Sequence, residues 1–213
     1  GFGREGPEVV KKLAAAYGLE IVDTTIFSPA ATDFSAELTK IKSSGAQALW
    51  LWTATPAGPT IVKQFKQLQL PQQLVLTGAN ASPQFLEGTC GDVNGAIVNS
   101  FLATVWKFLP KKDPVRVQAA LLEKIIKRPV SNFDGDAAGA LWAYKAAIER
   151  SNGTRAGINN ALETKLRGLV TPAGKIFLSK INHTGLQMGS MWAGKIRSCK
   201  LRPLHGAAFE KKK

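Results

Sequence analysis

The pattern of hydrophobic and polar residues over the first hundred positions switches repeatedly between helical and strand periods. Apolar residues recur at helical spacing from Pro7 to Tyr17, and Gly18 is a natural helix stop. Leu19–Val22 is a short apolar stretch that predicts a strand. Asp33 suits the N-cap of a second helix, which ends at Gly45. The continuous apolar run Ala46–Trp52 has the length and composition typical of a strand buried on both faces.

The same alternation continues to about residue 100. Pro59–Leu68 predicts a third helix and Leu74–Leu76 a strand, after which a short helix runs from Ser82–Pro83 toward Glu87. Ala96–Val98 predicts a further strand. Strands and helices that alternate with short connections favour an α/β fold with a parallel sheet.

The second half of the chain is richer in helical patterns. Three helices are predicted, and the middle one, rich in Ala and large apolar residues, is expected to be buried: Asp113–Ile126, Asp136–Arg150 and Thr154–Leu166. Two later apolar stretches suit strands or extended segments: Ile176–Leu178 and Met188–Ile196. Leu204–Lys213 has no apolar period and is expected to be a disordered tail.

Charge is concentrated in two stretches of this 213-residue chain, whose formal net charge is +13. Residues 107–128 carry +5 and residues 194–213 carry +6, so the rest of the chain is nearly neutral. Basic residues suit phosphate binding, but neither stretch interleaves them with aromatic residues on a platform. A solvated helix face and a basic tail are the favoured interpretation, and we expect no nucleic-acid partner. The longest apolar runs are also too short for a transmembrane helix.

Metal and nucleophile chemistry finds little support in the sequence. His183 and His205 lie far apart, and neither has a carboxylate or cysteine at ligand spacing, so we expect no metal site. Cys90 and Cys199 are too few for a disulfide scaffold or zinc site, and Cys90 has no histidine close by in the sequence to act as base. Structural or incidental cysteines are the better interpretation. We therefore expect no enzyme activity and no cofactor.

One phosphate-loop motif occurs at the start of the chain. Residues 1–6 spell Gly-x-Gly-x-x-Gly and lead into a helix, and Asp23 lies near the place of the acid in a dinucleotide site. No strand precedes this motif, and Arg4, Glu5 and Pro7 suit a tight loop poorly. A loop that leads into a helix is favoured. Asn80, Asn152 and Asn182 begin Asn-x-Ser/Thr triplets, which we interpret as chance matches outside a eukaryotic secretory context.

The remaining candidates lie where parallel strands end, because open α/β sheets bind ligands at that edge. Trp52, Ala54 and Thr55 follow the long apolar strand and lead into a helix, whose N-terminus suits an anion. Residues 77–80 follow the next strand and include Thr77, Gly78 and Asn80, and Phe2 should lie on the same edge. Aromatic walls with small polar groups describe a pocket for a small organic molecule. Helix caps or core contacts are the alternative for each residue.

A succession of short motifs resembles the type I periplasmic solute-binding proteins of branched-chain amino-acid ABC transporters. The most specific is Asp33-Phe34-Ser35 followed by Leu38-x-x-Ile41-Lys42. Others, in order, are Phe-Gly-Arg-Glu-Gly (2–6), Gly-Leu-Glu-Ile-Val (18–22), Gly45-Ala46, Lys63-Gln64-Phe65, Asp136-Ala137 and Ala146-Ala147-Ile148-Glu149. The resemblance covers residues 2–198.

This resemblance implies two α/β lobes with the ligand in the cleft between them, and one lobe is incomplete here. Residues 3–100 would form the main part of the second lobe, 101–187 return to the first, 188–203 cross back, and 204–213 form the tail. The family's ligand-facing aromatics correspond to Phe2 and Phe133. A small amino acid or carboxylate would be the ligand, an ABC permease the membrane partner, and the periplasm or cell exterior the location.

The chain departs from the family in three respects. The first half-lobe, with its Ser/Thr-rich ligand loops, has no counterpart here. Ala54-Thr55 replaces the aromatic usual at that place, and no acid is evident near position 78. We therefore expect weak or no ligand binding by this chain alone. The alternatives are a Rossmann-like nucleotide-binding protein and a basic protein that binds nucleic acid or membrane surfaces.

Overall fold

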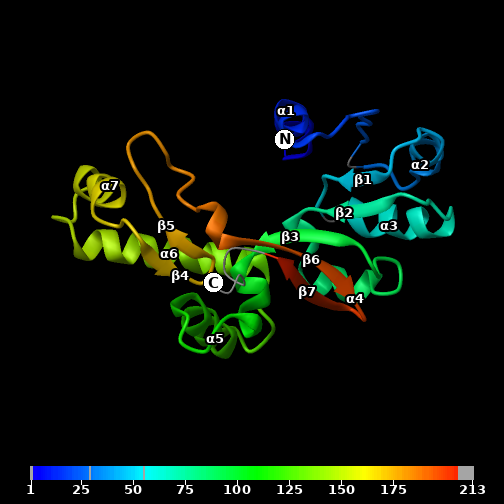
Figure 1. Ribbon diagram of the computed structural model, residues 1–213. Helices are drawn as coiled ribbons and strands as arrows, with labels where there is room; N and C mark the ends of the chain where they lie inside the picture. Colours follow the sequence, from blue (N-terminus) through cyan, green and yellow to red (C-terminus); the bar gives the residue numbers. More distant parts are fainter. Residues whose placement is uncertain (1, 29, 55, 206–213) are drawn as a thin grey trace. The chain divides into compact units, whose positions relative to one another are not determined.

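The computed structural model describes residues 2–28, 30–54 and 56–205 (Figure 1). Strands and helices alternate up to residue 101 and helices dominate the second half, which confirms the predicted α/β class. The helices are α1 (Phe2–Ala14), η1 (Ala15–Tyr17), α2 (Ser35–Lys42), α3 (Ala57–Gln67), η2 (Gly78–Asn80), α4 (Pro83–Thr89), η3 (Leu102–Phe108), α5 (Pro114–Ile126), α6 (Asn132–Glu149), α7 (Arg155–Thr164) and η4 (Met188–Ser190). The strands are β1 (Ala48–Leu51), β2 (Gln73–Leu76), β3 (Ile97–Phe101), β4 (Leu169–Thr171), β5 (Gly174–Ile176), β6 (Met191–Arg197) and β7 (Lys200–His205).

The chain divides into two compact units. Unit 1 comprises Gly1–Asn80, Gln84–Val98 and Lys195–Lys200. Unit 2 comprises Ala81–Pro83, Asn99–Gly194 and Leu201–Lys213. Strands β3, β6 and β7 each contain residues of both units. The assignment of chain segments to the two lobes of a binding protein stays a prediction.

A five-stranded sheet has the order β1-β2-β3-β6-β7. β1 and β2 are parallel, with Ala48 opposite Gln73 and Leu51 opposite Leu76, and β2 is parallel to β3. Connections through α3 and α4 make this arrangement possible, because parallel neighbours need a crossover. Within unit 1 the core is apolar and tightly closed, with Val62, Leu76 and Val98 fully buried.

Helix starts in unit 2 follow from capping side chains. Asp113 accepts hydrogen bonds from the N–H groups of Val115 and Arg116, so α5 begins at Pro114 as predicted. Thr154 likewise caps α7. The α6 helix begins at Asn132, four residues before the predicted start at Asp136, because Ser131 and Asp134 form a capping box there.

Several sequence-based expectations were wrong. The first helix begins at Phe2 instead of Pro7, which lies inside it. Residues 19–22 are not a strand, and Leu19 and Val22 are largely exposed. The strand β1 is not buried on both faces, because it is the last strand at its edge of the described sheet and leaves Trp50 43% exposed. The α6 helix is not buried all round, because Leu141 and Tyr144 on one face are more than half exposed.

A disulfide joins Cys90, just after α4, to Cys199 in the turn between β6 and β7. Their Cα atoms are 4.8 Å apart. The interpretation of the cysteines as structural is therefore correct, although the sequence did not predict that they pair. The expected disordered tail is wrong at Leu204 and His205, which end β7, and its residues 206–213 lie outside the described residues.

Candidate functional site

The carboxyl ends of β1 and β2 carry a buried polar network in unit 1. The Thr53 carbonyl oxygen accepts two hydrogen bonds, one from Thr77 Oγ1 at 3.1 Å and one from Asn80 Nδ2 at 2.9 Å. All three residues are at least nine-tenths buried. The two predicted ligand loops are therefore brought together, because parallel strands end at the same edge of the sheet.

Asn80 makes this edge compact. A Cβ atom on Gly58, in the first turn of α3, would lie only 2.7 Å from Asn80 Oδ1. A side chain at position 58 would therefore force Asn80 Oδ1 to move. Asn80 Oδ1 is buried and has no hydrogen-bond partner among the described residues. This oxygen is thus an acceptor whose desolvation the described contacts leave uncompensated.

Trp52 lies against α1. A Cβ atom on Gly6 would meet the Trp52 indole at 2.1 Å, so the glycine lets the helix backbone rest on the ring. The Trp50 and Trp52 rings are 5.5 Å apart between centroids. Trp52 therefore positions α1 beside β1, which is the core-contact role that the sequence left as an alternative.

The other predicted positions in unit 1 are distributed along the same loops. Ala54 is half-buried and its carbonyl accepts from Gly58 N at 3.2 Å. Gly78 is half-buried at the start of η2. Phe2 begins α1, but its side chain lies outside what the structure describes, and Thr55 is not among the described residues.

Phe133 belongs to unit 2, where it occupies the first turn of α6 and is mostly exposed. That turn is held firmly, because Asp134 receives two hydrogen bonds from Arg128 and one from the Ser131 hydroxyl. Burial alone would raise the pKa of Asp134, but these hydrogen bonds outweigh it and hold the pKa at about 2. The structure thus presents an aromatic ring from a rigid helix start.

Unit 2 also contains an apolar pocket of about 380 Å³ beside α6. Asp136 lines it, and its Oδ1 atom is buried without a hydrogen-bond partner in the described part of the chain. Burial raises the pKa of Asp136 to about 6. The sequence carries no local signal for this environment, because Asp136 there indicates only a helix start and part of a family motif.

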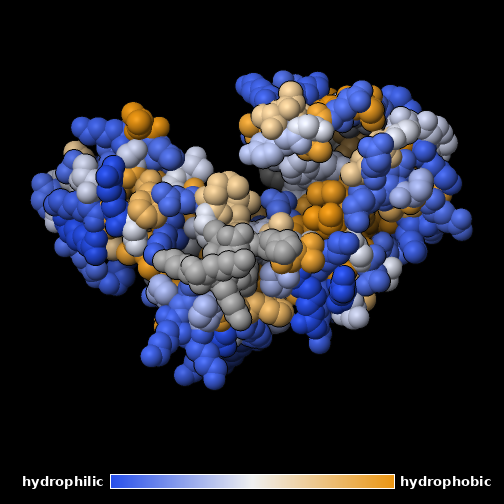
Figure 2. All heavy atoms as spheres, viewed as in Figure 1, coloured by the Kyte–Doolittle hydropathy of each residue, from blue (hydrophilic) through white to orange (hydrophobic). Residues whose placement is uncertain are grey.

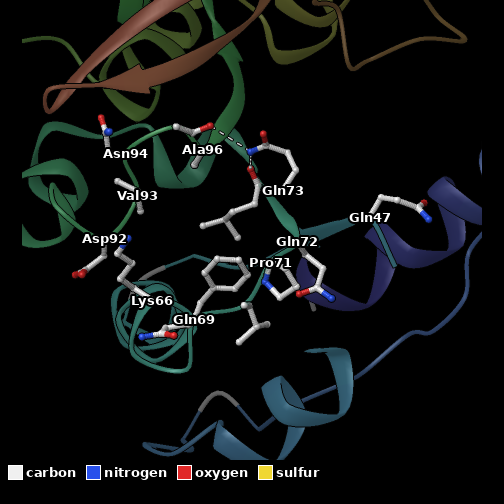
Figure 3. Close-up of a pocket in the computed structure, with 14 residues that line it drawn as sticks. Gln47, Lys66, Gln69, Pro71, Gln72, Gln73, Asp92, Val93, Asn94 and Ala96 are labelled. Atoms are coloured by element: carbon white, nitrogen blue, oxygen red, sulfur yellow. Dashed lines mark hydrogen bonds between the residues drawn. The ribbon is translucent and has the colours of Figure 1, made fainter. Parts of the chain in front are cut away.

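A second pocket, of about 760 Å³, lies in unit 1 at the amino ends of the strands, away from the loops described above (Figure 3). It is bordered by the amino end of β2, the end of α3 and the loop before β3. Gln73 Nε2 donates to the Gly95 and Leu74 carbonyls, and Gln72 Nε2 donates to those of Ile41 and Lys42. The amides of these two glutamines therefore hold the protein's own backbone, and we assign no ligand here.

Two alternative classes of site are not supported. Residues 2–6 are part of α1, so the Gly-x-Gly-x-x-Gly stretch is helix rather than a phosphate loop after a strand. Within residues 2–28, 30–54 and 56–205 there is no group of three or more His, Cys, Asp and Glu side chains that could hold a metal ion. None of the described helices is both long and apolar enough to span a bilayer.

Comparison with known proteins gives a consistent result. The family model described as periplasmic binding protein matches residues 1–200. An extracellular ligand-binding receptor from Rhodopseudomonas palustris HaA2 superposes with a TM-score of 0.86 at 19% identity, covering 95% of this chain and 60% of that one. No curated protein matches the chain.

Two further solved structures carry more specific titles. A leucine binding protein from Thermotoga maritima MSB8 has a TM-score of 0.78 at 18% identity, covering 93% of this chain and 55% of that one. A branched chain amino acid ABC transporter from Thermus thermophilus with bound valine has a TM-score of 0.72 at 20% identity, covering 98% and 59%. These likenesses establish the type I fold, and the chain spans about 60% of the length of the first of these neighbours.

Proposed function

The chain belongs to the periplasmic binding protein family, and from that premise we propose that it is part of an extracytoplasmic solute-binding protein that serves an ABC importer. The ligand would be a small amino acid or organic carboxylate. It would be held in the cleft of a two-lobed protein, and closure of the lobes would create the form that the permease recognises.

The observation that carries this proposal is the polar network of Thr53, Thr77 and Asn80. It fixes two loops at the carboxyl ends of adjacent parallel strands, the edge where open α/β sheets bind ligands. Backbone groups of Ala54 and Gly78 lie on those loops and would be the direct contacts. Thr77 and Asn80, being buried, would position the loops rather than touch the ligand.

The disulfide supports an extracytoplasmic location. Structural disulfides form and persist in oxidising compartments such as the periplasm and the cell exterior. The Cys90–Cys199 disulfide links the turn between β6 and β7 covalently to the segment after α4. A location outside the cytoplasm also agrees with the family to which the chain belongs.

Calorimetric titration with a panel of amino acids and aliphatic and aromatic carboxylic acids tests the proposal. We expect weak or no binding by the 213-residue chain and clear saturable binding by a longer polypeptide that contains it. Submicromolar binding by the chain alone would contradict the first expectation. A longer polypeptide that binds no member of the panel would refute the assignment of ligand class.

A matched pair of substitutions locates the site. Thr77→Val and Thr89→Val each remove one hydrogen bond donated by a buried hydroxyl, to Thr53 O and Phe85 O respectively, and Thr77→Val also removes a long 3.5 Å acceptor contact with Asn80 Nδ2. Both changes should cost about 1 kcal/mol of stability. Only Thr77→Val should also weaken ligand binding by the longer polypeptide, on the order of tenfold, since it alone holds a loop at the strand ends. Equal affinity in the two variants would place the ligand elsewhere.

A further inference from the structure

The α5 helix has exposed apolar side chains in addition to its buried face. Its inner face is buried, with Leu122 packed in a cluster with Ala103 and Val130. Its outer face carries three large apolar side chains at intervals of four residues, and they are 47–62% exposed: Val117, Leu121 and Ile125. Because residues four apart lie on the same side of a helix, these three form one continuous stripe.

Basic residues lie on α5 and next to both of its ends. Two basic residues of the region are neutralised, since Lys107 pairs with Glu123 and Arg128 pairs with Asp134. The Asp113 carboxylate is occupied by backbone N–H groups at the start of the helix. Four further lysines have no ion pair with any residue in the described part of the chain: Lys111, Lys112, Lys124 and Lys127.

We propose that this face of α5, here called the α5 surface (Val117, Leu121, Ile125 and the four lysines), docks on the surface of an anionic lipid bilayer. In the space-filling view, most of the surface in the region of α5, at the bottom of the picture, is hydrophilic (Figure 2). An amphipathic helix with an apolar stripe flanked by Lys lies in a bilayer interface, where its apolar side chains enter the acyl boundary and its cations meet anionic headgroups.

The chemistry of the stripe distinguishes a bilayer from a polynucleotide. Phosphates of a nucleic acid would neutralise the lysines but would leave the three apolar side chains in water. No aromatic residue occurs between Lys111 and Lys127 in the sequence, and the nearby Trp106 ring is already covered by Lys107 and Arg116. A bilayer satisfies both features at once, and it is the surface beside which an extracytoplasmic binding protein works.

Vesicle co-sedimentation of the full 213-residue chain tests the proposal. The probes are vesicles of equal parts phosphatidylglycerol and phosphatidylcholine, compared with pure phosphatidylcholine. We expect partitioning onto the anionic vesicles that falls as salt is raised. Lys124→Gln with Lys127→Gln should lower the partition coefficient about 25-fold, because each headgroup-facing lysine contributes about fivefold. Leu121→Ser should lower it on the order of tenfold.

Three controls keep the test specific to the α5 surface. Lys63→Gln with Lys66→Gln removes two exposed lysines of α3, and Leu141→Ser removes an exposed leucine of α6; neither should change partitioning. Neutralising Lys211, Lys212 and Lys213 to Gln should reduce it less than the α5 change does. Circular dichroism confirms that each variant is folded.

Several outcomes would overturn the proposal. Equal partitioning onto neutral and anionic vesicles would show that the lysines do not contribute to binding. Unchanged partitioning of Leu121→Ser would show that the apolar stripe does not contribute. Loss of binding only in the variant altered at residues 211–213 would assign it to the end of the chain. Tight binding to an oligonucleotide with none to vesicles would identify a nucleic-acid surface. None of these outcomes depends on solute binding, which calorimetry measures separately.

Discussion

Removing the Cys90–Cys199 disulfide should lower the stability of unit 1 substantially while leaving its fold intact. The two cysteines are separated by 109 residues, so the bond closes a long loop in the unfolded chain. Loop-closure entropy gives about 4.7 kcal/mol for a loop of about 100 residues at 25 °C, and measured effects are typically about 2–4 kcal/mol. We therefore expect Cys90→Ser with Cys199→Ser to lose about 3–4 kcal/mol.

The fold should persist because the joined segments are also held by hydrogen bonds. Ser198 N donates to Asn94 Oδ1 at 3.1 Å, Gly95 N donates to Ile196 O at 2.8 Å, and Ile196 N donates to Ala96 O at 2.9 Å. The disulfide therefore constrains the unfolded state more than it shapes the folded one. The far-ultraviolet circular dichroism spectrum of the double variant should match that of the parent chain.

Urea denaturation with and without reductant measures the effect. Oxidised parent protein should have the highest midpoint, and reductant should lower it to that of the double variant, on which reductant should have no effect. The thermal midpoint should fall by about 6–16 °C for a chain of this length. A double variant as stable as the oxidised parent would contradict this prediction, and so would a reductant that destabilises both proteins equally.

Two further predictions concern unit 2 and the packing of glycines. Gly135→Ala should lower the free energy of unfolding by about 1–3 kcal/mol, because the new Cβ would lie 2.7 Å from Ala103 Cβ. In Gly88→Ala, in α4, the new Cβ meets nothing within 4 Å, so the change should be neutral or stabilising by up to about 1 kcal/mol. Thermal denaturation of the two variants tests this difference. Burial raises the pKa of Asp136 to about 6 from 3.8, so the folded state favours the protonated acid and stability falls as pH rises between these values. Asp136→Asn should therefore gain about 1–2 kcal/mol at pH 7, after allowance for partial exposure, and little at pH 4, and an unchanged pH profile would contradict this.

Local signals predicted the helices and parallel strands well. The caps Asp113 and Thr154 and the short connections act within a few residues, so the sequence contains them directly. Segment 19–22 and Trp50 were mispredicted because an apolar run indicates only a tendency to be buried. Whether its residues pair as a strand and become buried depends on which other strands and helices lie beside them.

The sequence predicted that two of the proposed ligand loops lie together, but it did not predict the contacts between them. Because neighbouring parallel strands end at the same side of a sheet, the sequence pattern predicted that the loops after β1 and β2 lie close together. It could not anticipate that Thr77 and Asn80 both donate to the Thr53 carbonyl, nor that Trp52 supports α1 at Gly6. The pairing of Cys90 with Cys199 was equally hidden, since two cysteines 109 residues apart carry no local signal.

Two exposed apolar helix faces of unit 2 differ in a way that suggests different occupants. The α6 face carries Leu141, Tyr144 and Ile148, and the lysine beside them, Lys145, is paired with Glu149. An apolar face without an unpaired cation is suited to packing against another polypeptide surface. The α5 surface carries four unpaired lysines and suits an anionic bilayer instead. Leu141→Ser should therefore leave vesicle partitioning unchanged and lower the stability of a longer polypeptide. Leu121→Ser should lower vesicle partitioning and leave that stability unchanged.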